Sequence, residues 1–108
     1  MQDREAAIFN ALAHPMRLRI LEKLQDGPCC VCKIIPCVGG EQSNVSHHLA
    51  ILRKAHVVVS EKRGIEVWYR VTDARILEIL DLMKKCILRD LAQSNELYEA
   101  MMQGKDAR

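Results

Sequence analysis

Residues 43–55 read SNVSHHLAILRKA, and this stretch decides how the rest of the chain is interpreted. Val45, Leu49 and Leu52 recur at the spacing of one helix face, and Ser43 is a common residue type at a helix N-cap. The other positions include polar side chains from Ser43 to His48 and the cations Arg53 and Lys54 at the end. The pattern predicts a helix that begins at the Ser43 cap and presents a polar, partly basic face.

A turn precedes this helix, and three further helices are predicted before the turn. Gly39-Gly40 through Gln42 is interpreted as the turn of a helix-turn-helix, because consecutive glycines favour a change of chain direction. Proline positions and the spacing of Leu and Ile delimit the earlier elements. The predicted helices are a short one between Asp3 and His14, an amphipathic one over Pro15–Leu24 and a short one over about Cys30–Val38.

A β-hairpin and a long helix follow. Residues 56–62 are rich in β-branched Val, residues 65–71 alternate apolar and polar side chains, and Lys62-Arg63-Gly64 joins them. From Asp73, a suitable N-cap, to residue 103, apolar side chains step by three or four positions along one stripe. A small domain cannot cover so long a stripe by itself, so residues 73–103 are expected to be a dimerisation helix. Residues 104–108 are expected to form a frayed tail.

The element order predicts a mainly α fold with a β-hairpin wing, α-α-α-α-β-β-α, as one winged helix-turn-helix domain over residues 1–108. A length of 108 residues suffices for one core. A formal charge of +2 is too small for a non-specific polycation, so a nucleic-acid surface must concentrate charge locally. The N-terminus lacks a signal-peptide layout, and no apolar run approaches the roughly 20 residues of a membrane span. We therefore expect a cytoplasmic protein without a membrane partner.

A polar helix after a glycine turn, followed by a basic hairpin, predicts binding to double-stranded DNA. Hydrogen bonds to base edges in the major groove carry sequence information, and cations contact phosphates. Taken singly, these residues also fit a solvated helix face and a charged hairpin tip, but their combination is considerably more specific. The predicted DNA-contacting residues are Gln42, Ser43, Asn44, Ser46, His47, His48, Arg53, Lys54, Lys62 and Arg63.

Several segments resemble the ArsR/SmtB family of prokaryotic winged-helix repressors. They are ALAHPMRLRIL at residues 11–21, SNVSHHL at 43–49 with LRKA at 52–55, and RG at 63–64 with WYRV at 68–71. The resemblance covers nearly the whole chain. It implies a homodimer that binds a two-fold symmetric operator and leaves it when an inducer binds. One departure is His56, where members of the family usually have Gly after the recognition helix.

Four of the five cysteines, Cys29, Cys30, Cys32 and Cys37, lie within nine residues. They are too crowded to staple distant segments, and in a reducing cytoplasm they are expected to be thiols. Clustered thiolates favour thiophilic ions, three sulfurs suiting arsenite-like or lead-like centres and four suiting zinc or cadmium. The sulfurs of these cysteines can converge on one ion only if Cys29 or Cys30 lies outside the helix that follows. The alternative to a metal-binding role is that the cysteines pack as small apolar side chains, and this alternative is strongest for Cys37.

Cys30-Val31-Cys32 also resembles the Cys-x-Cys pair of arsenic- and cadmium-responsive family members. Those arsenic sensors have a third Cys where this chain has Ile35. The resemblance therefore implies a thiophilic metal or metalloid as inducer. The third ligand is left open between Cys29, Cys37 and the partner subunit.

Cys86, on the terminal helix, supplies a second hypothesis within the same family. Its default role is packing. The resemblance also suggests that Cys86 pairs with Cys32 or Cys37, and that a persulfide or an oxidant converts the two thiols to a disulfide. Such a bridge needs Cα atoms within about 7 Å, and a redox sensor of this kind requires no metal. Zinc-responsive members use Asp and His ligands on the terminal helix; this chain has no His from Asp73 onward, which excludes a zinc or nickel site of that type.

Two interpretations from other classes compete with the repressor. Cys29 and Cys32 have the Cys-x-x-Cys spacing of thiol oxidoreductases, but no strand is expected before them, and no phosphate loop or nucleophilic triad is evident. The other is a zinc-stabilised interaction module, which would lose its fold on chelation. We therefore expect a regulator and no enzyme.

Overall fold

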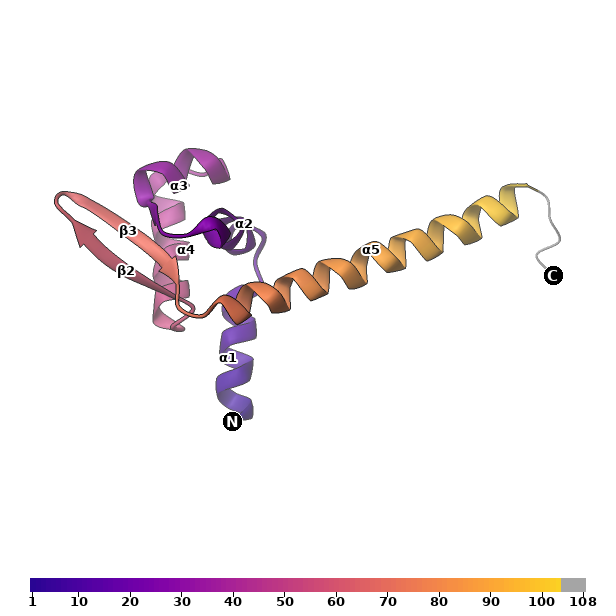
Figure 1. Cartoon of the computed structure of the whole chain (residues 1–108), viewed down its shortest axis with the longest axis horizontal. Coiled ribbons are helices and arrows are strands. Elements are labelled where there is room, and N and C mark those ends of the chain that lie inside the picture. The colour runs from indigo at the N-terminus through magenta and orange to yellow at the C-terminus, as the bar shows by residue number, and fades with distance from the viewer. Residues whose placement is uncertain (104–108) are drawn as a thin grey trace. The chain divides into compact units, whose positions relative to one another are not determined.

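The computed structural model describes residues 1–103, so the expected tail at 104–108 lies outside the described residues. Helices, a 3-10 turn and strands follow one another along the chain (Figure 1). They are α1 Gln2–Leu12, α2 Pro15–Lys23, η1 Leu24–Asp26, β1 Cys29–Cys30, α3 Val31–Val38, α4 Gln42–Lys54, β2 Val58–Arg63, β3 Glu66–Val71 and α5 Ala74–Met102. By its internal contacts the chain divides into two units, Met1–Leu77 and Glu78–Arg108. The predicted order of helices and hairpin is confirmed, whereas a single domain over residues 1–108 stays a prediction.

The sheet contains one strand more than the sequence predicts. Its order is β1-β3-β2, antiparallel throughout, and the hairpin turns at Gly64, whose φ of 64° lies in the left-handed region. β1 was missed because two residues are too few to show alternation. It is a strand because Cys29 pairs with Tyr69 and Cys30 with Trp68. This pairing brings the N-terminus of α3 next to the start of β3.

An aliphatic core holds α2, α3 and α4 against the base of the hairpin. The largest fully buried side chains are Ile20, Leu21, Ile34, Val45, Leu49, Leu52, Val57 and Val58. The apolar face predicted for residues 43–55 is thus confirmed. Burying each such side chain stabilises the fold by about 1.5–3 kcal/mol. The core thereby sets the rotation of α4 about its axis, which leaves the opposite face of the helix in solvent.

α4 begins earlier than predicted. Its N-cap is Glu41, without a side-chain cap, so the prediction of Ser43 as N-cap is wrong, and Gln42 is the first helical residue. The glycines explain the boundary. Gly39 ends α3 in the left-handed conformation, with φ of 74°, and a Cβ added to Gly40 would stand 2.8 Å from Cγ2 of Val45. The chain therefore completes its turn before Gln42 and brings α4 close against α2.

The C-terminus of α4 closes in a Schellman motif. The backbone amide of Val57 donates to the carbonyl of Leu52 at 2.9 Å, and that of His56 donates to the carbonyl of Arg53 at 3.0 Å. His56 has a φ of 62°, the left-handed conformation that glycine adopts most readily. This geometry favours Gly, the residue that the resemblance led us to expect at this position.

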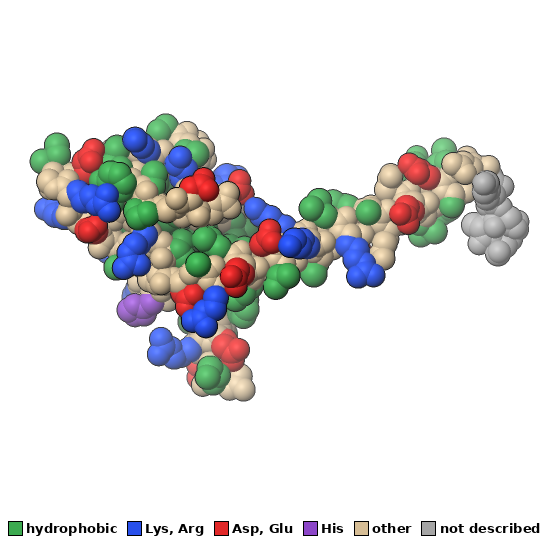
Figure 2. Space-filling model, viewed as in Figure 1, with side chains coloured by type: hydrophobic (Ala, Val, Ile, Leu, Met, Phe, Trp, Pro, Cys, Tyr) green, Lys and Arg blue, Asp and Glu red, His purple; other side chains and the backbone are tan. Residues whose placement is uncertain are grey.

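α5 begins at the predicted cap. A carboxylate oxygen of Asp73 accepts a hydrogen bond from the backbone amide of Arg75 at 2.9 Å. None of residues 74–102 is buried, and apolar side chains are visible along the helix in Figure 2. The exposed ones include Ile79, Leu82, Met83, Ile87, Leu88, Leu91, Leu97, Tyr98, Met101 and Met102. Within residues 1–103, no helix has both the length and the apolar character needed to cross a bilayer. An exposed apolar surface of this extent is typical of a docking face.

Candidate functional site

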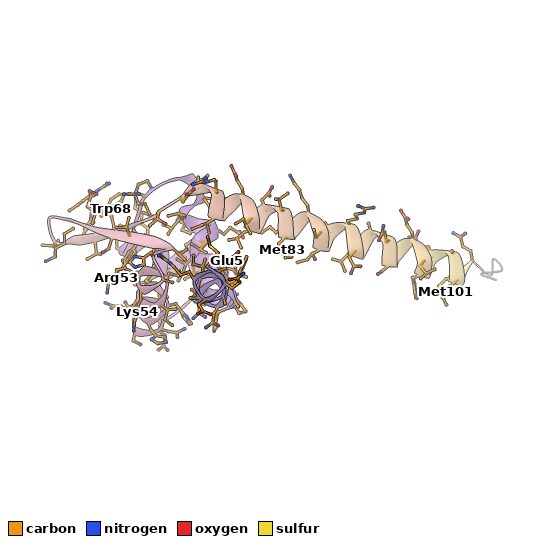
Figure 3. All side chains as sticks on the ribbon, turned by 90° about the horizontal axis from the view of Figure 1, so that it is seen from below. Glu5, Arg53, Lys54, Trp68, Met83 and Met101 are labelled. Atoms are coloured by element: carbon orange, nitrogen blue, oxygen red, sulfur yellow. A yellow bond between two sulfur atoms is a disulfide. The ribbon has the colours of Figure 1, made fainter. Side chains whose placement is uncertain are left out.

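The solvent-facing side of α4 is polar at its start and basic at its end. Its exposed polar residues are Gln42, Ser43, Asn44, Ser46, His47, Arg53 and Lys54. Figure 3 labels Arg53 and Lys54 at the C-terminal end of the helix. Amide, hydroxyl and imidazole groups can donate to and accept from base edges, while the two cations can contact phosphates. The structure therefore places all predicted contact residues of this helix but one on an accessible face.

The exception is His48, and the structure corrects that prediction. The residue is 6% exposed. Its ring lies 4.3 Å from the ring of His14 between centroids and accepts a hydrogen bond at Nδ1 from Arg17 at 3.1 Å. Burial, and then the charges of His14, Arg17 and His47, lower the pKa of His48 below its ordinary value. The buried ring packs α4 against the start of α2 and leaves little surface for a base edge, so we leave His48 out of the candidate interface.

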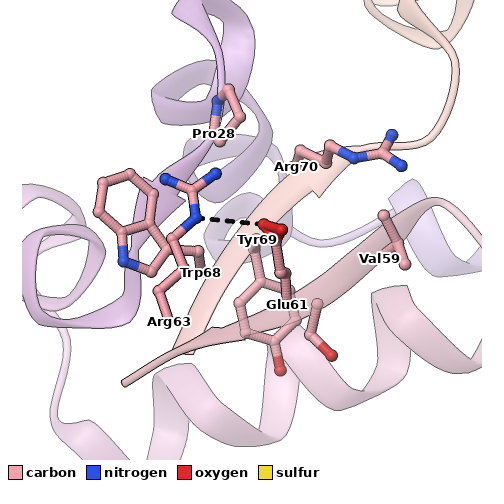
Figure 4. Close-up of a pocket in the computed structure, with 8 residues that line it drawn as sticks. Pro28, Val59, Glu61, Arg63, Trp68, Tyr69 and Arg70 are labelled. Atoms are coloured by element: carbon pink, nitrogen blue, oxygen red, sulfur yellow. Dashed lines mark hydrogen bonds and ion pairs between the residues drawn. The ribbon is translucent and has the colours of Figure 1, made fainter. Parts of the chain in front are cut away.

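The hairpin presents the remaining predicted cations near its tip. Lys62 and Arg63 are exposed at the end of β2. The guanidinium of Arg63 lies over the ring of Trp68, 4.2 Å from its centroid, and its Nε donates to Glu61 at 3.1 Å, the dashed line in Figure 4. These groups border a surface cavity of about 240 Å³. The contacts hold Arg63 in a defined position on the wing, whereas Lys62 extends into solvent.

Two of the clustered cysteines come together. Cys30 and Cys32 form a disulfide with Cα atoms 5.2 Å apart, so the expectation of free thiols is wrong for this pair. Cys30 lies in β1, off the helix, which is the arrangement that convergence was predicted to require. Its sulfur also accepts a hydrogen bond from the backbone amide of Cys32 at 3.2 Å and caps α3. The local fold of β1 and α3 thus produces a sulfur pair at a helix N-terminus.

The other cysteines are not part of that pair. Cys29 is buried, and its thiol faces the backbone carbonyl of Cys30 at 3.6 Å. Cys37 is exposed near the end of α3, and Cys86 is exposed on α5 in the second unit. A sensor role for Cys29 or Cys37, and a redox partnership of Cys86 with the cluster, stay predictions.

Glu66, which the sequence analysis missed, lies beside the sulfur pair. The ligand-capable atoms of Cys30, Cys32 and Glu66 all lie within 4.8 Å of one another. Strand alternation had placed Glu66 and Trp68 on one face, but only the β1–β3 register shows that this face meets the cysteines. A groove of about 600 Å³ adjoins the cluster and is lined by both cysteines, Glu66, and Gln42 and Ser46 of α4. The sulfur cluster and the candidate DNA helix therefore border the same space.

Comparisons with known proteins identify the fold and its family. The family model described as "Bacterial regulatory protein, arsR family" matches residues 14–60. An uncharacterised HTH-type transcriptional regulator of Methanocaldococcus jannaschii, MJ1325, is 43% identical over 82 residues, which are 75% of this chain and 92% of the relative. The chain belongs to the ArsR family. Because the family consists of transcriptional regulators, this membership excludes the thiol oxidoreductase interpretation.

Solved structures of this ArsR family fold agree with the arrangement described above. The crystal structure of Rv0081 from Mycobacterium tuberculosis has a TM-score of 0.76 at 36% identity and covers 83% of this chain and 91% of that one. The solution structure of a homodimeric winged helix-turn-helix DNA-binding domain from Mycobacterium bovis, Mb0332, has a TM-score of 0.75 at 26% identity, covering 82% and 85%. The fold is therefore a winged helix-turn-helix, in which α4 is the second helix of the helix-turn-helix and the β2–β3 hairpin is the wing.

Proposed function

We propose that this protein is a homodimeric repressor that, with its Cys30–Cys32 disulfide reduced, leaves its operator when a thiophilic metal or metalloid binds at Cys30 and Cys32. Arsenite, cadmium and lead are the candidate inducers. One observation carries the proposal: the two sulfurs border the same groove as Gln42 and Ser46 of the recognition helix. An ion bound there acts on the element that reads DNA.

DNA binding in this proposal uses the exposed face of α4 and the wing. Two recognition helices related by a dyad enter successive major grooves about 34 Å apart, so the operator has two-fold symmetry. The proposed base-reading residues are Gln42, Ser43, Asn44, Ser46 and His47, and the proposed phosphate contacts are Arg53, Lys54, Lys62 and Arg63. The exposure of all these side chains supports the assignment.

The dimer forms through α5. Met83, Ile87 and Leu91 follow one another at intervals of four residues, Leu82 lies beside them, and each is more than half exposed in the single chain. Pairing two such helices removes this apolar surface from water, which is the main favourable term in association. The M. bovis fragment of the same fold is described as homodimeric. A repressor of this kind acts on the chromosome, in the cytoplasm.

The coupling between ion and DNA runs through α3. Cys30 and Cys32 lie at its start, and its other end leads through Gly39 and Gly40 directly into α4. An ion that draws the two sulfurs and their neighbours together shifts the position of α3, and this shift changes the position of α4. A coupling free energy of about 1–3 kcal/mol weakens operator binding by roughly 5–150-fold.

A redox or persulfide sensor of the same fold is the second candidate, and the Cys30–Cys32 disulfide favours it. A persulfide, RSSH, first passes its outer sulfur to one cysteine and leaves as the thiol RSH. The second cysteine then attacks the inner sulfur of that cysteine persulfide, which forms the disulfide and releases hydrogen sulfide. In this alternative, formation of the bridge replaces ion binding as the signal.

The test begins with an operator selected from random duplexes by repeated binding to the reduced protein. Fluorescence anisotropy then measures its affinity with arsenite, cadmium, lead or a persulfide donor present. We expect at least one ion to weaken binding tenfold or more in the wild type. The Cys30→Ser/Cys32→Ser variant should not respond, whereas the Cys37→Ser control should respond normally. Indifference of the wild type to every reagent contradicts the sensor proposal, and a response to the persulfide alone, with a new intramolecular bridge by mass, selects the redox candidate.

A further inference from the structure

The distance between the carboxylate of Glu66 and the sulfurs of Cys30 and Cys32 is close to the distance between two ligand atoms of one metal ion. Oε2 of Glu66 is 3.9 Å from Sγ of Cys32, and all three ligand-capable atoms of the cluster lie within 4.8 Å of one another. Zinc–sulfur and zinc–oxygen bonds of about 2.0–2.3 Å place two ligand atoms of a tetrahedral centre about 3.5–3.8 Å apart. Small side-chain movements are therefore sufficient to bring the three groups onto one ion.

We propose that Glu66 is the third ligand of this cluster: once the disulfide is reduced, its carboxylate joins the thiolates of Cys30 and Cys32 in binding a divalent zinc or cadmium ion. The inference rests on the proposed function, since it names the inducer class and the third ligand at the same cluster. Reduction by an added dithiol transfers two electrons and two protons to the cystine, which gives two cysteine thiols and the cyclic disulfide of the reagent. Ion binding then displaces the thiol protons into solvent.

The carboxylate is held in place for this role by the next residue on its face of β3. The indole Nε1 of Trp68 donates to Oε1 of Glu66 at 3.1 Å, while the other oxygen faces Cys32. Hydrogen bonds of this kind orient metal-binding carboxylates and are a regular part of metal sites. Trp68 in turn lies beneath the guanidinium of Arg63. The site is thus connected by direct contacts to a cation of the wing.

The donor set selects among the thiophilic ions. Two thiolates and one carboxylate suit zinc and cadmium, which accept sulfur, nitrogen and oxygen ligands, whereas an arsenite-like centre prefers three sulfurs. Cys29 and Cys37 are the nearest further cysteines in the sequence, and neither belongs to the cluster found within residues 1–103. The groove beside the cluster leaves room for a fourth ligand such as water. The chemistry therefore favours a divalent cation over arsenite.

The experiment titrates cadmium into the reduced full-length protein under argon. Binding is followed by sulfur-to-cadmium charge-transfer absorption, with a competing chelator to fix the affinity, and by the emission of Trp68, the single tryptophan of the chain. Three proteins are compared: the wild type, Glu66→Gln, which keeps the size but loses the charged ligand, and Glu61→Gln. Glu61 is the matched control because it is an exposed carboxylate of the same hairpin that lies outside the cluster.

We expect Glu66→Gln to bind cadmium roughly 10–100-fold more weakly, a loss typical of damaged metal sites. The charge-transfer band should persist, because both thiolates remain, but the response of Trp68 to cadmium should disappear. Glu61→Gln should match the wild type in both measurements, and arsenite affinity should be equal in all three proteins. Equal cadmium affinity and an equal Trp68 response in Glu66→Gln and the wild type would overturn the inference.

The same titrations separate this inference from the proposed function. If cadmium binds through Glu66 but leaves DNA affinity unchanged, the site stands and the repressor mechanism fails. If cadmium binds the wild type and Glu66→Gln with equal affinity and releases DNA from both, the mechanism stands and Glu66 is not a ligand. Circular dichroism of the variants at the titration temperature verifies that they are folded.

Discussion

Arg17 of α2 connects the ring of His48 on α4 to the C-terminal end of α1. Its guanidinium donates to Nδ1 of His48 at 3.1 Å and, from Nε, to the carbonyl of Ala11 at 2.6 Å. Because arginine is a donor only, Nδ1 must accept, which places the proton of the neutral ring on Nε2. The recognition helix is therefore held by a contact that depends on an uncharged histidine.

This dependence predicts that stability falls as the solution is acidified. The unfolded His48 titrates near its ordinary pKa of 6.5, whereas the pKa in the folded chain is lowered, chiefly by burial. Between those two values the unfolded state binds the additional proton, so the free energy of unfolding decreases as pH falls below about 6.5, by at most about 1.4 kcal/mol per pH unit. Urea unfolding from pH 7.5 to pH 5 measures the slope.

His48→Asn is the matched variant, because the amide oxygen of Asn stands near the position of Nδ1 and does not titrate. It should retain the hydrogen bond from Arg17 and lose the part of the slope that belongs to His48. Identical slopes in the two proteins would show that His48 does not control the acid sensitivity.

Gly40→Ala should destabilise the fold by about 1–3 kcal/mol, the usual cost of overpacking. A Cβ at this position would stand 2.8 Å from Cγ2 of Val45 and 3.0 Å from Cε of Met16. Met16 can move its flexible end, but Val45 is fully buried on α4. Denaturant unfolding provides the measurement. In a double-mutant cycle with Val45→Ala, the combined loss should be smaller than the sum of the two single losses, and strict additivity would argue that the clash is not the cause.

His56→Gly should stabilise the protein by about 0.5–1 kcal/mol. A side chain in the left-handed conformation costs about 1–2 kcal/mol, and the greater freedom of glycine in the unfolded chain offsets part of this gain. The converse change, Gly64→Ala at φ of 64°, should lower stability, because it places a side chain in the left-handed conformation. No atom lies within 4 Å of the new Cβ, so this backbone strain is the whole of the expected loss. A loss of stability in His56→Gly would mean that the imidazole makes a contact worth more than the strain.

The elements that sequence reasoning predicted are those with local signals. Helical spacing marked the buried face of α4, alternation marked the hairpin, and Asp73 marked the start of α5. His48 was misplaced although it stands three residues after Val45 and four before Leu52, which is the buried face; its polar character was given more weight than its position. Glu66 was missed for another reason. Its approach to Cys30 depends on pairing between β1 and β3, a contact between distant segments that no local pattern encodes.

Lys62→Ala should weaken binding to a random-sequence duplex and flatten its salt dependence. The side chain is exposed at the wing, where we propose a phosphate contact, and each phosphate contact contributes about 0.9 to the slope of log affinity against log salt. A dimer loses two such contacts, so the slope should fall by about 2 when anisotropy titrations span about 50–200 mM salt. Lys85→Ala removes an equal charge from an exposed pair with Asp81 on α5, and it should leave the slope unchanged. Asn44→Ala should instead reduce affinity for the selected operator while random-sequence binding stays the same, because a base contact adds little to the salt-dependent term. Equal slopes for Lys62→Ala and Lys85→Ala would remove the wing from the proposed interface.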